Sequence, residues 1–131
     1  MSKQAVSYEL TLTDKIEDKS VFFADLIGEM TRSPLSYSYR ENNENASVEI
    51  KIVDGWVRLI RKAEANTEIN FDEKQVTEFH IVNDQTQLMG QVETLNLVNL
   101  PQYLFIHYRL WVNDAIIAEQ EMELKVKVSE A

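Results

Sequence analysis

Hydrophobic and polar residues alternate along much of the chain, and the alternation is most regular over residues 103–128. One side of these two segments carries Leu104, Ile106, Tyr108, Leu110 and Val112, and then Ile116, Ala118, Gln120, Met122, Leu124, Val126 and Val128. A period of two with one apolar face is typical of antiparallel strands that bury one side of their sheet. Residues 103–128 therefore predict a long hairpin with its apolar side in the core.

The turn of this hairpin is predicted from the faces that it brings together. A two-residue loop would place Tyr108 opposite Glu119 and set a core face against a charged one, because a one-residue slip inverts every side chain. A three-residue loop over 113–115 keeps like faces together. Its inner pairs are Val112–Ile116, Leu110–Ala118, Ile106–Met122 and Leu104–Leu124, and its outer pairs are Arg109–Glu119, His107–Glu121 and Trp111–Ile117.

Shorter alternating segments fill the rest of the chain. They cover residues 6–12, 35–39, 48–52, 57–61, 67–71, 77–82 and 88–92, and residues 95–101 are predicted as a connection. Residues 20–31 favour a strand that breaks at Gly28, although their apolar positions also fit one face of a short helix. Asp54 and Gly55 predict a two-residue turn.

Turn signals at regular spacing, with little or no helix, predict an all-β fold. We expect one domain over residues 1–131, an antiparallel up-and-down β-barrel of about 8–10 strands. Closure into a barrel also removes the exposed edges that long strands would otherwise leave.

The order of these elements resembles the YwiB-like family, small bacterial proteins of uncharacterised function. The resemblance covers nearly the whole chain and rests on residues 35–41 (LSYSYRE), 48–52 (VEIKI), 54–55 (DG), 57–61 (VRLIR) and the final hairpin. It implies a calycin-like barrel, related in shape to lipocalins and fatty-acid-binding proteins. It implies no established activity, substrate or catalytic residue.

Composition narrows the classes of partner. The 131 residues carry a net charge of −9, which argues against a sequence-independent grip on nucleic acid. Trp56, Arg58 and Lys62 form a small basic and aromatic cluster, but a period of two places Arg61 on the opposite side. No apolar run reaches the length of a membrane span. Without cysteine or a secretory signal pattern, the chain is expected in the cytoplasm.

Residues that could support catalysis or bind metal are sparse. His80 and His107 lie on different predicted strands and have no ligand-spaced partner. The glycines, Gly28, Gly55 and Gly90, form no phosphate-binding loop, and no serine lies in a G-x-S-x-G motif. We therefore expect no metal, no cofactor and no enzymatic activity.

The candidate ligand site lies on the inward face of the predicted barrel. Its residues are Arg61, Tyr37, Tyr39, Tyr108 and Phe79. A barrel of this size either fills with side chains or holds one small ligand, so we expect a non-enzymatic barrel that binds a small apolar or amphipathic acid. An inward Arg61 needs an anion, and a ligand carboxylate, tyrosine hydroxyls or Glu41 would each serve. The other interpretation is a packed core in which Arg61 extends to the rim.

The alternative function is a protein-interaction or homo-oligomeric module. Tyr103, Phe105 and Trp111 share the outer face of the final hairpin, and exposed aromatic side chains in a row are typical of interfaces. The N-terminal segment could equally cover them.

Overall fold

The alternating segments form strands in the computed structural model, which describes residues 3–41 and 45–128. The ten strands are β1 (Gln4–Asp14), β2 (Lys19–Arg32), β3 (Leu35–Glu41), β4 (Ala46–Val53), β5 (Trp56–Lys62), β6 (Asn66–Phe71), β7 (Thr77–Val82), β8 (Gln87–Leu100), β9 (Tyr103–Val112) and β10 (Ala115–Val128). These ranges contain no helix, so none that could cross a membrane.

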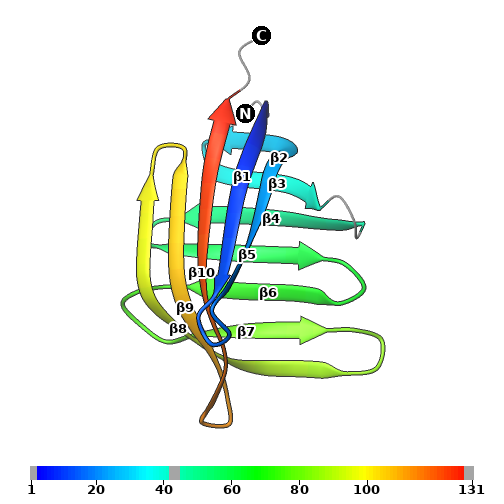
Figure 1. Cartoon of the computed structure of the whole chain (residues 1–131), viewed down its shortest axis with the longest axis vertical. Helices are drawn as coiled ribbons and strands as arrows, with labels where there is room; N and C mark the ends of the chain where they lie inside the picture. Colours follow the sequence, from blue (N-terminus) through cyan, green and yellow to red (C-terminus); the bar gives the residue numbers. More distant parts are fainter. Residues whose placement is uncertain (1–2, 42–44, 129–131) are drawn as a thin grey trace.

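The strands close into an antiparallel barrel in the order β1-β10-β9-β8-β7-β6-β5-β4-β3-β2. Figure 1 shows β3 to β7 running across the molecule, while β1, β10 and β9 run along it. The long strands β2 and β8 bend between these two layers. The first half of β8 pairs with β7 and the second half with β9, and only the last part of β2 pairs with β3. Each layer buries one face against the other.

The core follows the predicted alternation. Leu110 and Met122 are only 8% and 3% exposed, whereas the acidic side chains on the opposite face of β10 reach solvent. Arg61 lies opposite Val48 on the inner face of β4–β5, as the two-residue turn at Asp54 and Gly55 predicted. The prediction of an all-β antiparallel barrel of about 8–10 strands is confirmed, and the described residues form ten.

The turn of the final hairpin differs from the prediction. Asn113 and Asp114 form a two-residue turn in which both residues take a positive φ, 48° and 67°. That geometry is typical of tight hairpins because its twist matches the strands. The predicted loop 113–115 was therefore wrong, since Ala115 pairs with Val112.

A bulge beside this turn restores the predicted faces. Trp111 pairs with Ile116, Leu110 pairs with Ala118, and the extra residue Ile117 lies between them. The predicted pairs Val112–Ile116 and Trp111–Ile117 were therefore wrong. Ile116 and Ile117 are 42% and 45% exposed. Beyond the bulge every other predicted pair is confirmed: Leu110–Ala118, Arg109–Glu119, His107–Glu121, Ile106–Met122 and Leu104–Leu124.

Two other predicted boundaries need correction. β2 runs through Gly28 without a break, and its irregularity lies at Asp25, which takes a φ of 56° opposite the register shift between Tyr8 and Leu10. Gly28 is required for another reason: a Cβ there would lie 1.9 Å from the Ser38 carbonyl oxygen. Residues 95–100 are strand and not a connection, because β8 continues to Leu100.

Candidate functional site

An apolar cavity of about 200 Å³ opens at one end of the barrel. Its lining comes from β1, β2, β3, β4, β5, β6, β9 and β10: Leu10, Leu12, Phe23, Leu26, Tyr39, Glu41, Val48, Leu59, Arg61, Thr67, Ile69, Tyr108, Gln120 and Met122. Most of these are aliphatic or aromatic, and the polar groups are few. A hollow of this composition is typical of a small-molecule site.

Arg61 and Glu41 form an ion pair on the cavity wall. Arg61 Nε donates to both carboxylate oxygens of Glu41, at 3.1 and 3.0 Å, and Arg61 Nη2 lies 3.0 Å from Oε2. The two side chains are 30% and 28% exposed, so the pair lies at the boundary between the cavity and solvent. Glu41 on β3 was one of the partners predicted for Arg61, and the structure shows this pair.

Two tyrosines complete the polar part of the cavity. The Tyr108 hydroxyl donates to Gln120 Oε1 at 2.7 Å, and burial raises the pKa of Tyr108 to about 12. Burial also raises the pKa of Tyr39 well above its usual value, and the nearby Glu41 carboxylate raises it further. Both phenols therefore remain neutral at physiological pH and can donate hydrogen bonds.

The other two predicted ligand residues lie in the packed core. Phe79 is fully buried and lies so close to Gly90 that a Cβ there would be 2.6 Å from its ring. Tyr37 is also buried and packs edge-on against Tyr8, with ring centroids 6.0 Å apart. The structure thus brings Arg61, Tyr39 and Tyr108 to one cavity and leaves Tyr37 and Phe79 outside it.

Sequence reasoning did not single out Thr67 and Gln120, which also line the cavity. The signal was present, because Gln120 interrupts an otherwise apolar face of β10 and Thr67 shares a face with Ile69. A polar residue on an inward face marks either a hydrogen-bonded core group or a cavity wall. Here Tyr108 bonds to Gln120, and Arg61 pairs across the sheet with Thr67.

The aromatic residues predicted as an interaction surface are half-buried. The Tyr103 hydroxyl donates to Glu123 Oε2 at 2.9 Å, and Trp111 Nε1 donates to Glu93 Oε1 at 3.1 Å. Phe105 lies between Val98 and Glu123 on the neighbouring strands. Cross-strand neighbours therefore engage much of this face, and its role as an interface stays a prediction.

The outer face of the final hairpin also carries a small charged cluster. His107 Nε2 lies 2.8 Å from Glu119 Oε2, and Arg109 Nε donates to Glu119 Oε1 at 2.9 Å. These two hydrogen bonds lower the pKa of Glu119, that from His107 having the larger effect. His107 thus reaches past Glu121, its partner across the sheet. Within residues 3–41 and 45–128, no group of three or more His, Asp or Glu side chains could hold a metal ion.

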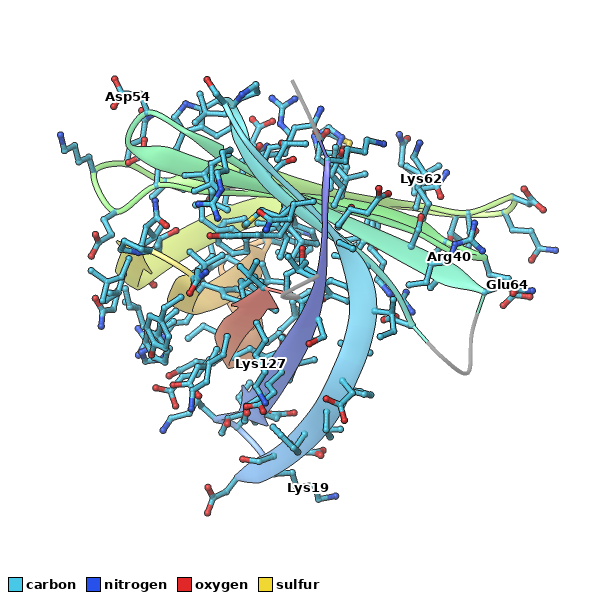
Figure 2. All side chains as sticks on the ribbon, turned by 90° about the horizontal axis from the view of Figure 1, so that it is seen from above. Lys19, Arg40, Asp54, Lys62, Glu64 and Lys127 are labelled. Atoms are coloured by element: carbon cyan, nitrogen blue, oxygen red, sulfur yellow. The ribbon has the colours of Figure 1, made fainter. Side chains whose placement is uncertain are left out.

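A second hollow, of about 820 Å³, is an open groove on the outer face of β2–β5. Its charged lining residues are Lys3, Glu29, Arg40, Glu49, Lys51 and Lys62. Ser47 on β4 pairs with Arg40 on β3 and with Lys62 on β5. Figure 2 shows Arg40 and Lys62 on the same side of the molecule. Part of the basic cluster noted in the sequence thus lies outside, on the opposite face of the sheet from Arg61.

Comparison with known proteins places this barrel in a family. The chain is similar to the YwiB protein from Bacillus subtilis, whose crystal structure superposes with a TM-score of 0.73 at 13% identity, over 98% of this chain and 93% of that one. That identity supports a shared fold alone. No curated protein matches the chain. The model of the family described as "Domain of unknown function (DUF1934)" matches residues 6–124, and the chain belongs to this family.

Proposed function

We propose that this protein is a non-enzymatic binding protein that holds a small amphipathic acid in the cavity at the barrel mouth. The ligand carboxylate binds the guanidinium of Arg61, and the apolar part lies against Leu10 and Met122. The observation that carries this proposal is an arginine on the wall of an otherwise apolar hollow. A buried or half-buried guanidinium is most stable with an anion, and carboxylates match its planar donors.

The size of the cavity limits the ligand. About 200 Å³ is less than the roughly 300–1,000 Å³ of sites for drug-sized molecules, but it exceeds an apolar cavity of about 150 Å³ that admits benzene. The proposed ligand is therefore a short acid whose apolar part is about as large as one aromatic ring. A long fatty acid would not fit, so the analogy with fatty-acid-binding proteins extends to the shape of the barrel and not to the ligand.

Glu41 is an internal competitor for this site. It occupies Arg61 in the absence of ligand, and both side chains are partly exposed, so exchange with a solute carboxylate does not require the core to open. The neutral hydroxyl of Tyr39 and the amide nitrogen of Gln120 can donate to the same carboxylate, while Tyr108 donates its own proton to Gln120 Oε1. Such an exchange needs no catalytic group. The reducing cytoplasm expected for this cysteine-free chain stays part of the proposal.

Titration of the full chain with benzoate and hexanoate, followed by NMR chemical shifts, tests the proposal. The matched ligand controls are benzamide and hexanamide, which have the same shape without the charge. Arg61→Gln should weaken acid binding about 10–100-fold, the value of one or two charge-assisted hydrogen bonds. Arg58→Gln is the matched protein control, because Arg58 lies on the outer face of the same strand and bonds to Asn70.

Specific shifts at cavity residues that depend on both the carboxylate and Arg61 would support the proposal. Native mass spectrometry of gently purified protein gives an independent measurement, in which a small acid should be retained. The proposal fails if the wild-type chain binds none of these acids, or if Arg61→Gln binds them as tightly as Arg58→Gln does.

A further inference from the structure

The first half of β2 is paired on one side only. Residues 19–23 and 26–27 pair with β1 on either side of the bulge, whereas the pairing with β3 begins at Gly28. Among the residues that the structure describes, no other strand pairs with this stretch. Figure 1 shows it running beside β1 down the long axis, away from β3. One row of backbone N–H and C=O groups therefore faces outward, a template for another strand.

The side chains of residues 19–25 are exposed on both faces of this strand. Phe22 is 59% exposed, and its neighbours Val21 and Phe23 are exposed as well. Val21, Phe22 and Phe23 thus place three consecutive large apolar residues on an open edge. Proteins usually protect such edges with charge, proline or a bulge, and here the bulge lies only at the far end, at Asp25.

The charges of this stretch are complementary to their own antiparallel copy. When residues 19–25 are paired with the same residues of a second chain about Phe22, Lys19 faces Asp25 at both ends. Ser20 then faces Ala24, and Val21 faces Phe23. Figure 2 shows Lys19 at the outer end of β2, projecting away from the barrel. Within its own chain Asp25 lies near Lys127, whose ammonium already pairs with Glu9.

We propose that residues 19–25 of β2 pair antiparallel with the same segment of a second copy of this chain, about a two-fold axis at Phe22. The contact is isologous and closes, so it gives a dimer and not a filament. One short strand from each chain buries less than a standard interface, so the dimer forms in a concentration-dependent equilibrium. Because Phe23 also lines the mouth cavity, the second chain extends the apolar wall beside the opening.

Sedimentation of the full chain over a range of concentrations tests the dimer. Wild type should shift from monomer to dimer as concentration rises. Phe22→Lys should remain monomeric, because it sets two ammonium groups against each other at the two-fold axis. Leu100→Lys is the matched control: Leu100 is 54% exposed and belongs to the second half of β8, for which β9 is the one pairing partner in residues 3–41 and 45–128. It should behave like wild type.

Charge reversal tests the register without touching the apolar residues. Lys19→Glu and Asp25→Lys should each weaken self-association, since each sets like charges together at both ends. An equimolar mixture of the two variants should form a heterodimer, because both ends are then complementary. Thermal melts establish that each variant is folded, which matters for Asp25→Lys because Asp25 has a positive φ.

A single cysteine provides a direct readout in this cysteine-free chain. Phe22→Cys should form an intermolecular disulfide on mild oxidation, since facing residues of antiparallel strands lie about 4.5–5.5 Å apart. Leu100→Cys should form far less. The proposal fails if wild type is monomeric at every soluble concentration, if Leu100→Lys and not Phe22→Lys dissociates the dimer, or if the mixed charge variants form no heterodimer.

Discussion

Arg61 and Glu41 meet at the mouth of the barrel from β5 and β3, with Arg61 Nε 3.0 and 3.1 Å from the two carboxylate oxygens. The strands bring them together because each side chain lies on the inner face of its strand, near the end where the barrel opens. This pair decides the charge of the proposed site. The Glu41 carboxylate offsets the positive charge of Arg61, and replacing it with a neutral group makes the cavity more positive.

Glu41→Gln should therefore change the affinity for a short acid while leaving the free energy of unfolding nearly unchanged. Both side chains are partly exposed, so the free energy of unfolding should change by only about 0–1 kcal/mol. Affinity for a short acid should rise, because a neutral amide competes poorly for the guanidinium. Chemical denaturation and the benzoate titration measure the two effects. Glu49→Gln, which breaks a surface pair with Lys51, is the control. A drop in affinity for Glu41→Gln would mean that Glu41 helps to hold the ligand instead of competing with it.

Gly28→Ala should be the most damaging conservative change in β2. The new methyl group would lie 1.9 Å from the Ser38 carbonyl oxygen and 2.8 Å from the Tyr8 ring. Because the first of these is backbone, relief requires β2 and β3 to separate, and we expect a loss of about 3 kcal/mol. Gly55→Ala is the comparison, since its φ of 85° is strained but no atom lies within 4 Å, and it should cost about 1 kcal/mol. Equal melting temperatures for the two variants would contradict the close approach.

The fold was predictable from the sequence because the alternation of apolar and polar residues assigns each side chain to the inner or the outer face of its strand. Leu110, Met122 and Arg61 lie on the predicted side, and the pairing across β4–β5 follows from one turn. However, alternation shows only whether a position is odd or even. It therefore cannot distinguish a three-residue loop from a two-residue turn followed by a bulge. Both restore the same register beyond Ala118. Predicting the type of turn therefore requires the backbone angles of Asn113 and Asp114, which depend on the twist of the sheet.

The candidate site was predictable only in part. Inward position singled out Arg61, Tyr39 and Tyr108, but the same rule also selected Tyr37 and Phe79, which fill the core. Whether an inward side chain packs or lines a hollow depends on where along the barrel axis it lies. That position follows from how β2 and β8 bend between layers, which an alternating pattern does not record. The open edge of residues 19–27 has the same origin.

Deletion of Ile117 should leave the hairpin intact. Ile117 is the extra residue of the bulge, so without it Trp111–Ile116 and Leu110–Ala118 become successive pairs after the same two-residue turn. Every inner side chain keeps its face, and the free energy of unfolding should remain within about 1 kcal/mol of wild type. Deletion of the fully buried Leu124 is the control, and it should prevent folding because part of β10 must reverse its faces. An unfolded Ile117 deletion would show that the bulge is needed to coil the strand.

The five tyrosines should make the protein sensitive to alkali. The pKa of each is raised, chiefly by burial, and that of Tyr108 reaches about 12. In the unfolded chain a tyrosine ionises near its ordinary pKa of about 10. The stability that these neutral tyrosines contribute is therefore fully present below about pH 10. It is lost as the pH rises through their pKa values in the folded protein.

Ionisation of these tyrosines should consequently coincide with unfolding. In a titration from neutral pH upward, tyrosinate absorbance should stay low while the β-sheet circular dichroism persists, and the two signals should change together. Protein in concentrated denaturant is the control and should ionise near the ordinary value. Tyr108→Phe should resist alkali better than wild type, because it removes one group whose ionisation favours the unfolded chain, although it also breaks the bond to Gln120. Full ionisation of the tyrosines near their ordinary pKa, with an unchanged dichroism spectrum, would mean that water reaches the inner face of the barrel.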